Sequence, residues 1–328
     1  MRGVEPPSSR PGRNPGALER SKELDFEQRP NLLSVKRATL SLMLLRRLLR
    51  RFWGNTAPAG AAPVPRPPSG VVALTFVGHA TVMLTTPRVR LLTDPMLEHS
   101  FFGLPRARAA ALDAADLDDV RLVLISHAHR DHLAVKTLAR VDRRATLVVP
   151  AHCQALVASL GFARVVELSV GQEVEVDGVR ITAVPARHSG RRRLFDRTRR
   201  GANGYVIRTE GRCLYFAGDT GYFSGFTEIG RRYAPEVALL PIAGYQPAPF
   251  RDEHLSPLDA LYAFEDLGAR TFIPIAYGSF QTSYEPIDEP LAWLSALVQA
   301  RKLGARVTVL EHGQTCLLRE AASARSPG

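Results

Sequence analysis

The chain of 328 residues has little cysteine and almost no lysine. Its 3 cysteines are far apart and form no CxxC pair, so neither a disulfide framework nor a thiolate zinc site is expected. The first stretch of the chain lacks the apolar core that a signal peptide needs. Arginine supplies nearly all of the basic residues, and the formal net charge of +11 attracts anionic partners without choosing among phospholipid, nucleic acid and phosphorylated metabolites.

Residues 1–70 are expected to precede the folded domain. Residues 1 to about 30 are rich in Pro, Gly, Ser, Arg and Glu, which predicts disorder, and the proline-rich residues 54–70 predict a linker. Between them, residues 40–53 place leucines on one helical face and arginines on another. Such a basic amphipathic helix suits a membrane interface, or it packs on the core of the protein itself. Its apolar run is too short and too charged to cross a bilayer.

A single folded domain is expected over residues 71–320, followed by a disordered tail over residues 321–328. Strand-like and helical patterns are mixed along it, which favours an α/β fold with two packed sheets covered by helices. Strands are expected at 71–77, 81–85, 89–92, 122–125, 146–149, 179–184, 205–208, 213–216, 237–241, 271–275, 306–310 and 315–318, and helices at 134–139, 154–160, 257–267 and 290–302.

The most informative segment is Ser126–His132, which reads Ser-His-Ala-His-Arg-Asp-His and directly follows the apolar residues 122–125. Imidazole and carboxylate are good ligands for zinc and similar ions. The close spacing lets His127 and His129 bind one ion, and Asp131 and His132 a second. The alternative of a solvated polar loop does not explain why so many ligand types gather there.

Further ligands are needed if this loop holds two ions. His188 follows an expected strand, and Asp219 follows another, between glycines that permit close approach of the backbone. His254 lies just before an expected helix. Each of these residues alone is ordinary for a loop. They indicate a metal site only together with the Ser126–His132 segment.

Together these motifs resemble the metallo-β-lactamase-fold hydrolases, and within them the phospholipase D that hydrolyses N-acylphosphatidylethanolamine and its bacterial relatives. The resemblance covers about residues 71–292 and implies a four-layer αββα sandwich of two mixed β-sheets flanked by helices. The segments that carry it are Val77–Val82, Leu92–Pro95, Ser126–His132, Arg187–Arg192, Leu194–Arg197, Phe216–Tyr222, Pro241–Pro247 and His254–Pro257.

The resemblance also implies the metal ligands. A first zinc ion would take His127, His129 and His188, and a second Asp131 and His132, with Asp219 bridging both. A zinc-bound hydroxide would then be the nucleophile, and Asp131 would belong to the catalytic group.

Supporting residues follow from the same resemblance. Asp94 would orient a ligand histidine, and His79 would do the same or be a core histidine. His254 would contact substrate or assist proton transfer.

One position departs from the family pattern. The relatives carry a histidine ligand for the second ion where this chain has Ala276. The centre is therefore expected to hold one or two zinc ions, with Tyr277 or His254 as candidates to fill the gap.

Seven arginines surround His188 in the sequence and favour an anionic substrate, because guanidinium pairs well with phosphate. We expect a phosphodiesterase acting on a phospholipid-like substrate, in a cytoplasmic protein with peripheral contact to the inner membrane face. Alternatives are a lactonase of the same fold, a nuclease, and a non-catalytic membrane-associated protein. No specific nucleic-acid partner is expected, and the sequence gives no indication of oligomeric state. The expected substrate contacts are Arg191, Arg192, Tyr245 and Tyr277.

Overall fold

The structure, a computed structural model, describes residues 66–112, 115–192 and 196–319. Several predicted segments lie outside the described residues: the disordered N-terminus, the amphipathic helix 40–53, most of the linker and the tail 321–328. Arg66, inside the predicted linker, already contacts the domain, since its Nη2 lies 2.8 Å from an Asp119 carboxylate oxygen. None of the described helices is both long enough and apolar enough for a transmembrane span.

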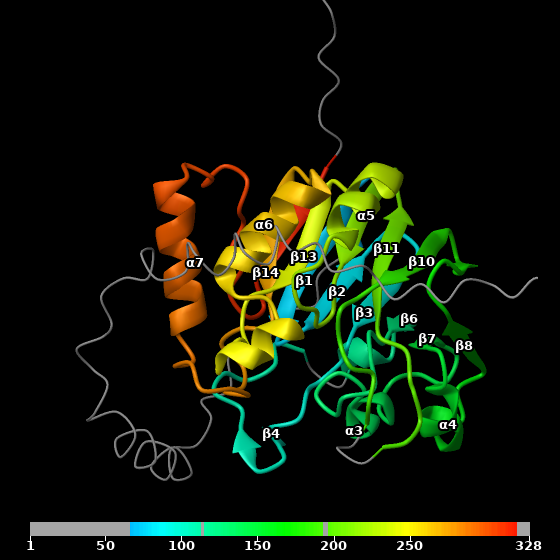
Figure 1. Ribbon diagram of the computed structural model, residues 1–328. Helices are drawn as coiled ribbons and strands as arrows, with labels where there is room; N and C mark the ends of the chain where they lie inside the picture. Colours follow the sequence, from blue (N-terminus) through cyan, green and yellow to red (C-terminus); the bar gives the residue numbers. More distant parts are fainter. Residues whose placement is uncertain (1–65, 113–114, 193–195, 320–328) are drawn as a thin grey trace, which may run out of the picture.

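Two mixed β-sheets form the centre of the domain (Figure 1). The first sheet has the order β15 (Thr315–Leu318), β1 (Val72–Gly78), β2 (Thr81–Thr85), β3 (Arg90–Thr93), β6 (Val120–Leu124), β7 (Thr146–Pro150) and β8 (Arg164–Leu168). The second has the order β14 (Thr271–Ile275), β13 (Val237–Pro241), β12 (Arg212–Phe216), β11 (Asn203–Thr209), β10 (Val179–Pro185) and β9 (Glu173–Val176). A short hairpin, β4 (Ser100–Phe101) and β5 (Leu104–Pro105), stands apart from both.

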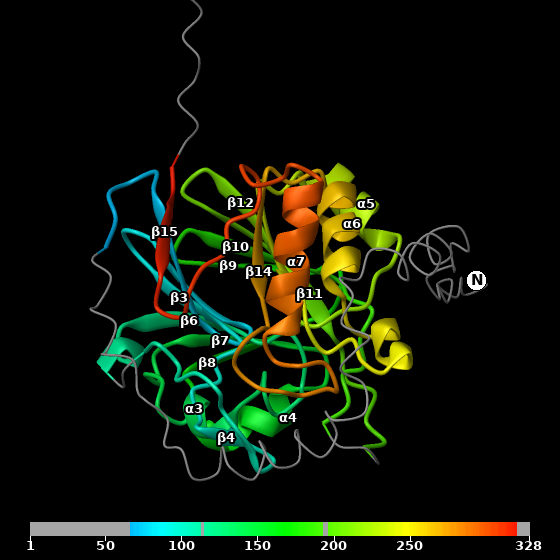
Figure 2. The same ribbon diagram turned by 90° about the vertical axis from the view of Figure 1, so that its left-hand side faces the viewer.

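Helices cover the outer faces of both sheets. The helices α3 (Val135–Leu138) and α4 (Gln154–Val157) pack their apolar residues with those of the first sheet. The helices α5 (Gly225–Tyr233), α6 (Pro257–Leu267) and α7 (Glu289–Ala300) lie beside the second sheet, as the turned view shows (Figure 2). The short 3₁₀ helices are η2 (Ala115–Leu117), η3 (Ala158–Leu160) and η4 (Ala248–Asp252). These layers confirm the predicted αββα sandwich.

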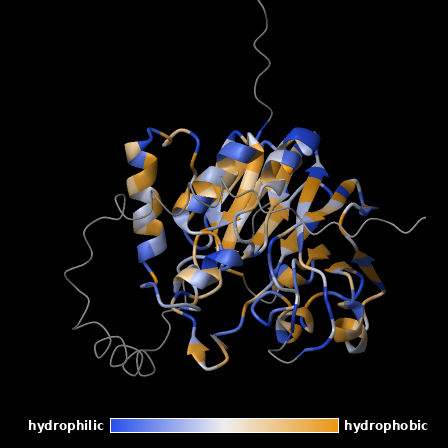
Figure 3. Ribbon diagram, viewed as in Figure 1, coloured by the Kyte–Doolittle hydropathy of each residue, from blue (hydrophilic) through white to orange (hydrophobic). Residues whose placement is uncertain are grey.

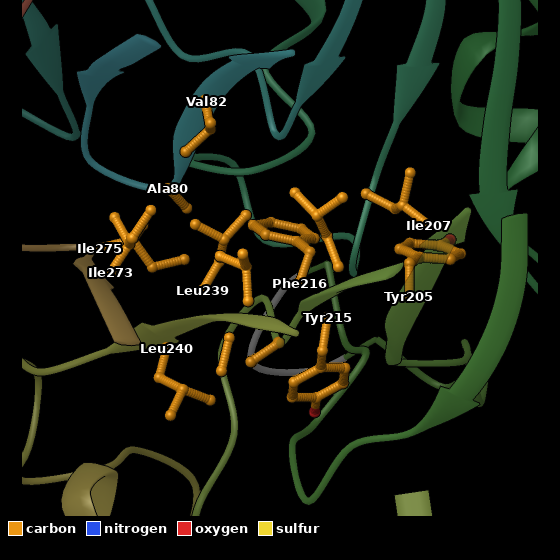
Figure 4. Close-up of a cluster of buried hydrophobic side chains, with 14 of the residues drawn as sticks. Ala80, Val82, Tyr205, Ile207, Tyr215, Phe216, Leu239, Leu240, Ile273 and Ile275 are labelled. Carbon is orange, nitrogen blue, oxygen red and sulfur yellow. The ribbon is translucent and has the colours of Figure 1, made fainter. Parts of the chain in front are cut away.

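The main core lies between the two sheets. Figure 3 shows the central strands as mostly hydrophobic, with hydrophilic residues concentrated in the loops and helix ends. Side chains alternate along each strand: Phe216 and Leu239 face Val82 across the layer, whereas Tyr215 and Leu240 point away from it (Figure 4). Burial of apolar surface between the sheets fixes which loops meet at their ends.

The element predictions fail in a few places. Residues 306–310 do not form a strand, because only one bridge, Phe272 to Val307, is present. The edge strands β8 and β9 were not predicted, since Glu173–Val176 alternates charged and apolar residues over only 4 positions. Helix α5 was also missed, because it buries only Phe226 and Ile229.

The strand directions bring the motif loops to one edge. β1, β3 and β6 run in the same direction in the first sheet, as do β10, β12 and β14 in the second. The segments that follow these strands hold the motif residues, and loops at the carboxyl ends of strands are the usual place for a site in α/β proteins.

Candidate metal centre

Asp94 anchors the loop that carries most of the predicted ligands. It follows β3 and is fully buried. Its carboxylate accepts hydrogen bonds from the Ser126 backbone N–H (2.6 Å), the Ser126 hydroxyl (2.5 Å) and His132 Nδ1 (2.7 Å). Asp94 thus fixes both ends of the Ser126–His132 loop, in the supporting position that the resemblance implied.

Three imidazoles converge beside this loop. His129 Nδ1 lies 2.8 Å from His127 Nε2 and 3.1 Å from His188 Nε2. Two nitrogens that bind one tetrahedral zinc ion are about 3.3 Å apart, because each Zn–N bond is about 2.0–2.1 Å. The spacing therefore matches a shared cation.

The hydrogen bonds around these rings fix where their lone pairs point. Because the Ser126 hydroxyl donates to Asp94, it accepts from His127 Nδ1 (2.9 Å), which leaves His127 Nε2 unprotonated. His188 Nδ1 donates to the Glu253 carbonyl (2.9 Å), which leaves His188 Nε2 unprotonated in the same way. A single proton on His129 Nδ1 cannot bond to the lone pairs of both His127 Nε2 and His188 Nε2. One metal ion can bind these nitrogens together, so the donor set fits a metal ion.

The pKa shifts agree with neutral imidazoles. Burial lowers the pKa of His127 well below its usual range, and the neighbouring histidines lower it further. Burial likewise lowers the pKa of His188 to about 3, although Asp219 opposes the shift. Neutral imidazole is the form that binds zinc.

A second group of ligands adjoins the first. His132 Nε2 lies 3.0 Å from an Asp219 carboxylate oxygen and 3.6 Å from an Asp131 carboxylate oxygen. On the far side, His79 Nε2 lies 3.1 Å from the same Asp131 oxygen. The ligand atoms of His79, Asp131 and His132 all lie within 4.8 Å of one another.

This second group attracts a cation. His132 Nε2 is buried and has no partner with hydrogen-bond geometry. Burial alone would lower the pKa of His132, but Asp219, Asp131 and Asp94 outweigh it and raise the pKa well above its usual range. The carboxylates therefore stabilise a positive charge at this atom, which a metal ion supplies as well as a proton does.

A glycine allows the two sheets to bring these ligands together. Gly218 has a φ of +61°, and a Cβ built on it would lie 2.3 Å from the Ser126 Cβ. The loop that carries Asp219 from the second sheet thus lies directly against the metal loop of the first. Only glycine permits both this backbone conformation and this approach.

His254 stands at the rim of the centre. Its Nδ1 lies 3.1 Å from the Phe250 carbonyl, to which it donates, and its Nε2 lies 3.7 Å from an Asp219 oxygen. Its side chain is 24% exposed, so it can meet both solvent and ligand. A capping box between Ser256, the N-cap of α6, and Asp259 fixes the approach of the chain to the helix.

The predicted substrate residues do not all reach the centre. Tyr245 is buried and donates its hydroxyl to Glu289 (2.9 Å), and Tyr277 is buried and donates to the Leu310 carbonyl (2.5 Å). Both rings pack in the core, which removes the geometric basis for their predicted substrate contacts and for Tyr277 as a replacement ligand. Arg192 Nη1 binds the backbone carbonyls of Ala128, His129 and Leu133, so it holds the metal loop. Arg191 is exposed, and its substrate contact stays a prediction.

Sequence reasoning missed several aromatic and basic residues at the rim. Phe250 is 42% exposed and its ring centroid lies 6.3 Å from that of His254. Phe102, at the turn of the β4–β5 hairpin, is 72% exposed, and the Arg130 guanidinium lies 4.9 Å from its ring. Arg130 directly follows the predicted ligand His129 in the sequence, and this adjacency could have predicted its position at the rim.

Comparisons with known proteins identify a family and several relatives. A family model described as the beta-lactamase superfamily domain matches residues 89–277. A metal-dependent hydrolase of the UPF0173 family from Methanopyrus kandleri is 34% identical over 74% of this chain and 98% of its own. An N-acyl-phosphatidylethanolamine-hydrolyzing phospholipase D from Caenorhabditis elegans is 33% identical over 71% of each chain.

Among solved structures, a metallo hydrolase from Ignicoccus hospitalis is similar to this protein with a TM-score of 0.58 and 27% identity. The similarity covers 76% of this chain and 100% of that one.

Proposed function

Because this chain belongs to the beta-lactamase superfamily of metal-dependent hydrolases, we propose that it hydrolyses a phosphodiester bond in a phospholipid-like anionic substrate. The observation that carries the proposal is the convergence of two ligand groups that share one loop, His127 with His129 and Asp131 with His132. Asp219 lies between these groups from the other sheet. Adjacent metal sites of this kind suit in-line displacement at phosphorus.

The ligand types favour zinc, which accepts imidazole and carboxylate together. When bound, such ions lower the pKa of water and offset negative charge that develops on phosphoryl oxygens. The chain contributes the alignment: Asp94 holds His132, and the Glu253 carbonyl holds His188. These contacts keep the ligands in place before substrate arrives.

His254 is placed for proton transfer to the leaving group. Donation from Nδ1 to the Phe250 carbonyl leaves Nε2 free to exchange a proton near Asp219. A partly exposed imidazole at this position can take up a proton at Nε2 and give it to the leaving group.

The rim supports an amphiphilic anionic substrate. Arg130 is exposed and next to His129, where its charge attracts a phosphodiester. Phe102, beside Arg130, and Phe250, beside His254, expose aromatic surface, which suits the boundary between headgroup and acyl chain. The relative from Caenorhabditis elegans bears a name that assigns it such a lipid.

The test uses the full-length chain reloaded with zinc and compares hydrolysis of several substrates. We expect turnover of N-acylphosphatidylethanolamine in mixed vesicles, weaker turnover of a soluble phosphodiester, and none of a simple lactone. His129→Ala abolishes this turnover. Hydrolysis of the lactone in preference to both phosphodiesters would contradict the proposal and favour the lactonase alternative.

Membrane contact through residues 40–53 belongs to the same proposal. Replacement of Arg46, Arg47, Arg50 and Arg51 by Gln should weaken sedimentation with anionic vesicles, because each basic residue near such a surface contributes about 1 kcal/mol. Unchanged vesicle binding would show that this segment does not carry the contact.

A further inference from the structure

We propose that His79 is a direct ligand of the second metal ion and takes the place of the histidine that the resemblance implied at the position of Ala276. The inference rests on the metal centre of the proposed function and concerns this chain's own ligand set. It follows from the positions of these two residues, from the ring of His79 and from its surroundings.

The two residues lie side by side. Ala276 follows β14 in the second sheet, and its backbone N–H donates to the carbonyl of His79 (2.9 Å), which follows β1 in the first. The methyl group of Ala276 offers no ligand atom. The imidazole of the neighbouring His79 does reach Asp131.

The ring of His79 already has the spacing of a ligand. Its Nε2 lies 3.1 Å from an Asp131 oxygen, close to the 2.8 Å and 3.1 Å that separate the nitrogens of the first trio. The ligand atoms of His79, Asp131 and His132 lie within 4.8 Å of one another. With Asp219, which lies 3.0 Å from His132, these residues provide the tetrahedral set that zinc prefers.

The backbone of His79 is held in a conformation that few residues other than glycine adopt. Its φ is +57°, which costs on the order of 1–3 kcal/mol for such a residue. The His79 N–H donates to the Ser279 hydroxyl (2.7 Å), and its carbonyl accepts from Ala276. Hydrogen bonds on both sides of the residue hold the conformation that points the imidazole at Asp131.

Neighbouring side chains also fix the ring. Phe280 meets it edge to face with ring centroids 5.5 Å apart, and the Arg106 guanidinium lies 4.7 Å from the Phe280 ring. Arg106 is itself only 1% exposed and binds the Met96 carbonyl (3.0 Å). His79, at 5% exposure, is therefore confined to one orientation, as a metal ligand must be.

The competing role is that of a positioning residue, which would donate a hydrogen bond to Asp131 and never touch the ion. Glutamine separates the two roles, because its amide also donates a hydrogen bond but is a poor zinc ligand. Ala276 is partly exposed and has a φ of +59°, a backbone conformation in which histidine is more frequent than most residues other than glycine.

The experiment counts ions and needs no substrate. Metal-free full-length protein is dialysed against buffered free Zn²⁺, and bound zinc is measured by elemental mass spectrometry. The wild type is expected to bind two ions. His79→Ala and His79→Gln should each keep the first ion and bind the second at least tenfold more weakly. Adding Ala276→His to His79→Ala should restore the second ion.

Three outcomes would overturn the proposal: a wild type that binds a single ion, a His79→Gln variant that keeps both at unchanged affinity, or failure of Ala276→His to rescue. Retention of the first ion in each variant shows that the fold is intact. Because phosphodiester turnover is measured separately, two ions without turnover would contradict only the proposed function.

Discussion

His132 Nδ1 lies 2.7 Å from an Asp94 oxygen, and both side chains are fully buried. This contact joins the end of β3 to the metal loop after β6 and leaves His132 Nε2 as the atom that faces Asp131 and Asp219. Asp94 therefore determines which nitrogen of His132 is available to an ion.

Asp94→Asn should weaken metal binding about 10–100-fold, because the amide no longer holds His132 Nδ1–H with a charged acceptor. A competition titration with a zinc chelator measures the change. Asp118→Asn is the matched control, since Asp118 is exposed. Equal affinities in the two variants would show that the Asp94 contact does not tune the site.

Gly218→Ala should lower the free energy of unfolding by about 2–5 kcal/mol, since a positive φ and a close contact with Ser126 both penalise a Cβ. Gly161→Ala is the control: its φ is +73°, but no atom lies within 4 Å of the added Cβ. It should cost only about 1–2 kcal/mol. Urea unfolding of the metal-free proteins tests the difference, and equal losses would contradict the close approach of the two loops.

The metal-free protein should lose stability as the pH falls from about 6.5 toward 4. Burial holds the pKa of His127, His129 and His188 below the ordinary histidine value of about 6.5, so the unfolded chain binds protons in this window while the folded chain does not. His132 has a raised pKa and is protonated in both states there, so it adds no slope.

Urea unfolding across this pH range measures the effect. His188→Gln removes one titrating group, whose pKa in the folded protein is about 3. In this variant, the free energy of unfolding should change less steeply with pH, by up to about 1.4 kcal/mol per pH unit. An unchanged slope would mean that His188 is protonated in the folded, metal-free protein.

His254→Ala should leave zinc content unchanged and reduce kcat for the phosphodiester about 10²–10⁴-fold, because the variant keeps all ligands on the metal loop but lacks the proton donor at the rim. Elemental analysis and steady-state kinetics on the same sample separate the two effects. Loss of zinc along with activity would instead make His254 a ligand, since its ligand atom lies within 4.8 Å of those of His188 and Asp219.

The sequence predicted the layers of the fold and the location of the site because both depend on local patterns. Apolar strands such as 122–125 are followed directly by ligand residues, and the loop after β6 holds four of them within one short segment. The resemblance then placed His188 and Asp219 in the same centre, and the structure brings both to it.

Long-range packing could not be predicted in this way. Tyr245 and Tyr277 stand in or beside motif segments, yet their rings turn into the core because hydroxyl acceptors lie there, at Glu289 and at the Leu310 carbonyl. The position of His79 beside Ala276 depends on the contact between the two sheets, because these two residues are about 200 positions apart in the sequence. No local pattern carries that information.

The centre takes His127, His129, Asp131 and His132 from one sheet and His188 and Asp219 from the other. An ion held there acts as a cross-link between two halves of the chain, much as a disulfide would in a protein whose cysteines are unpaired. Binding free energy is then also folding free energy, so thermal stability should rise with free zinc concentration. The melting temperature of this protein should therefore report the concentration of metal available to it.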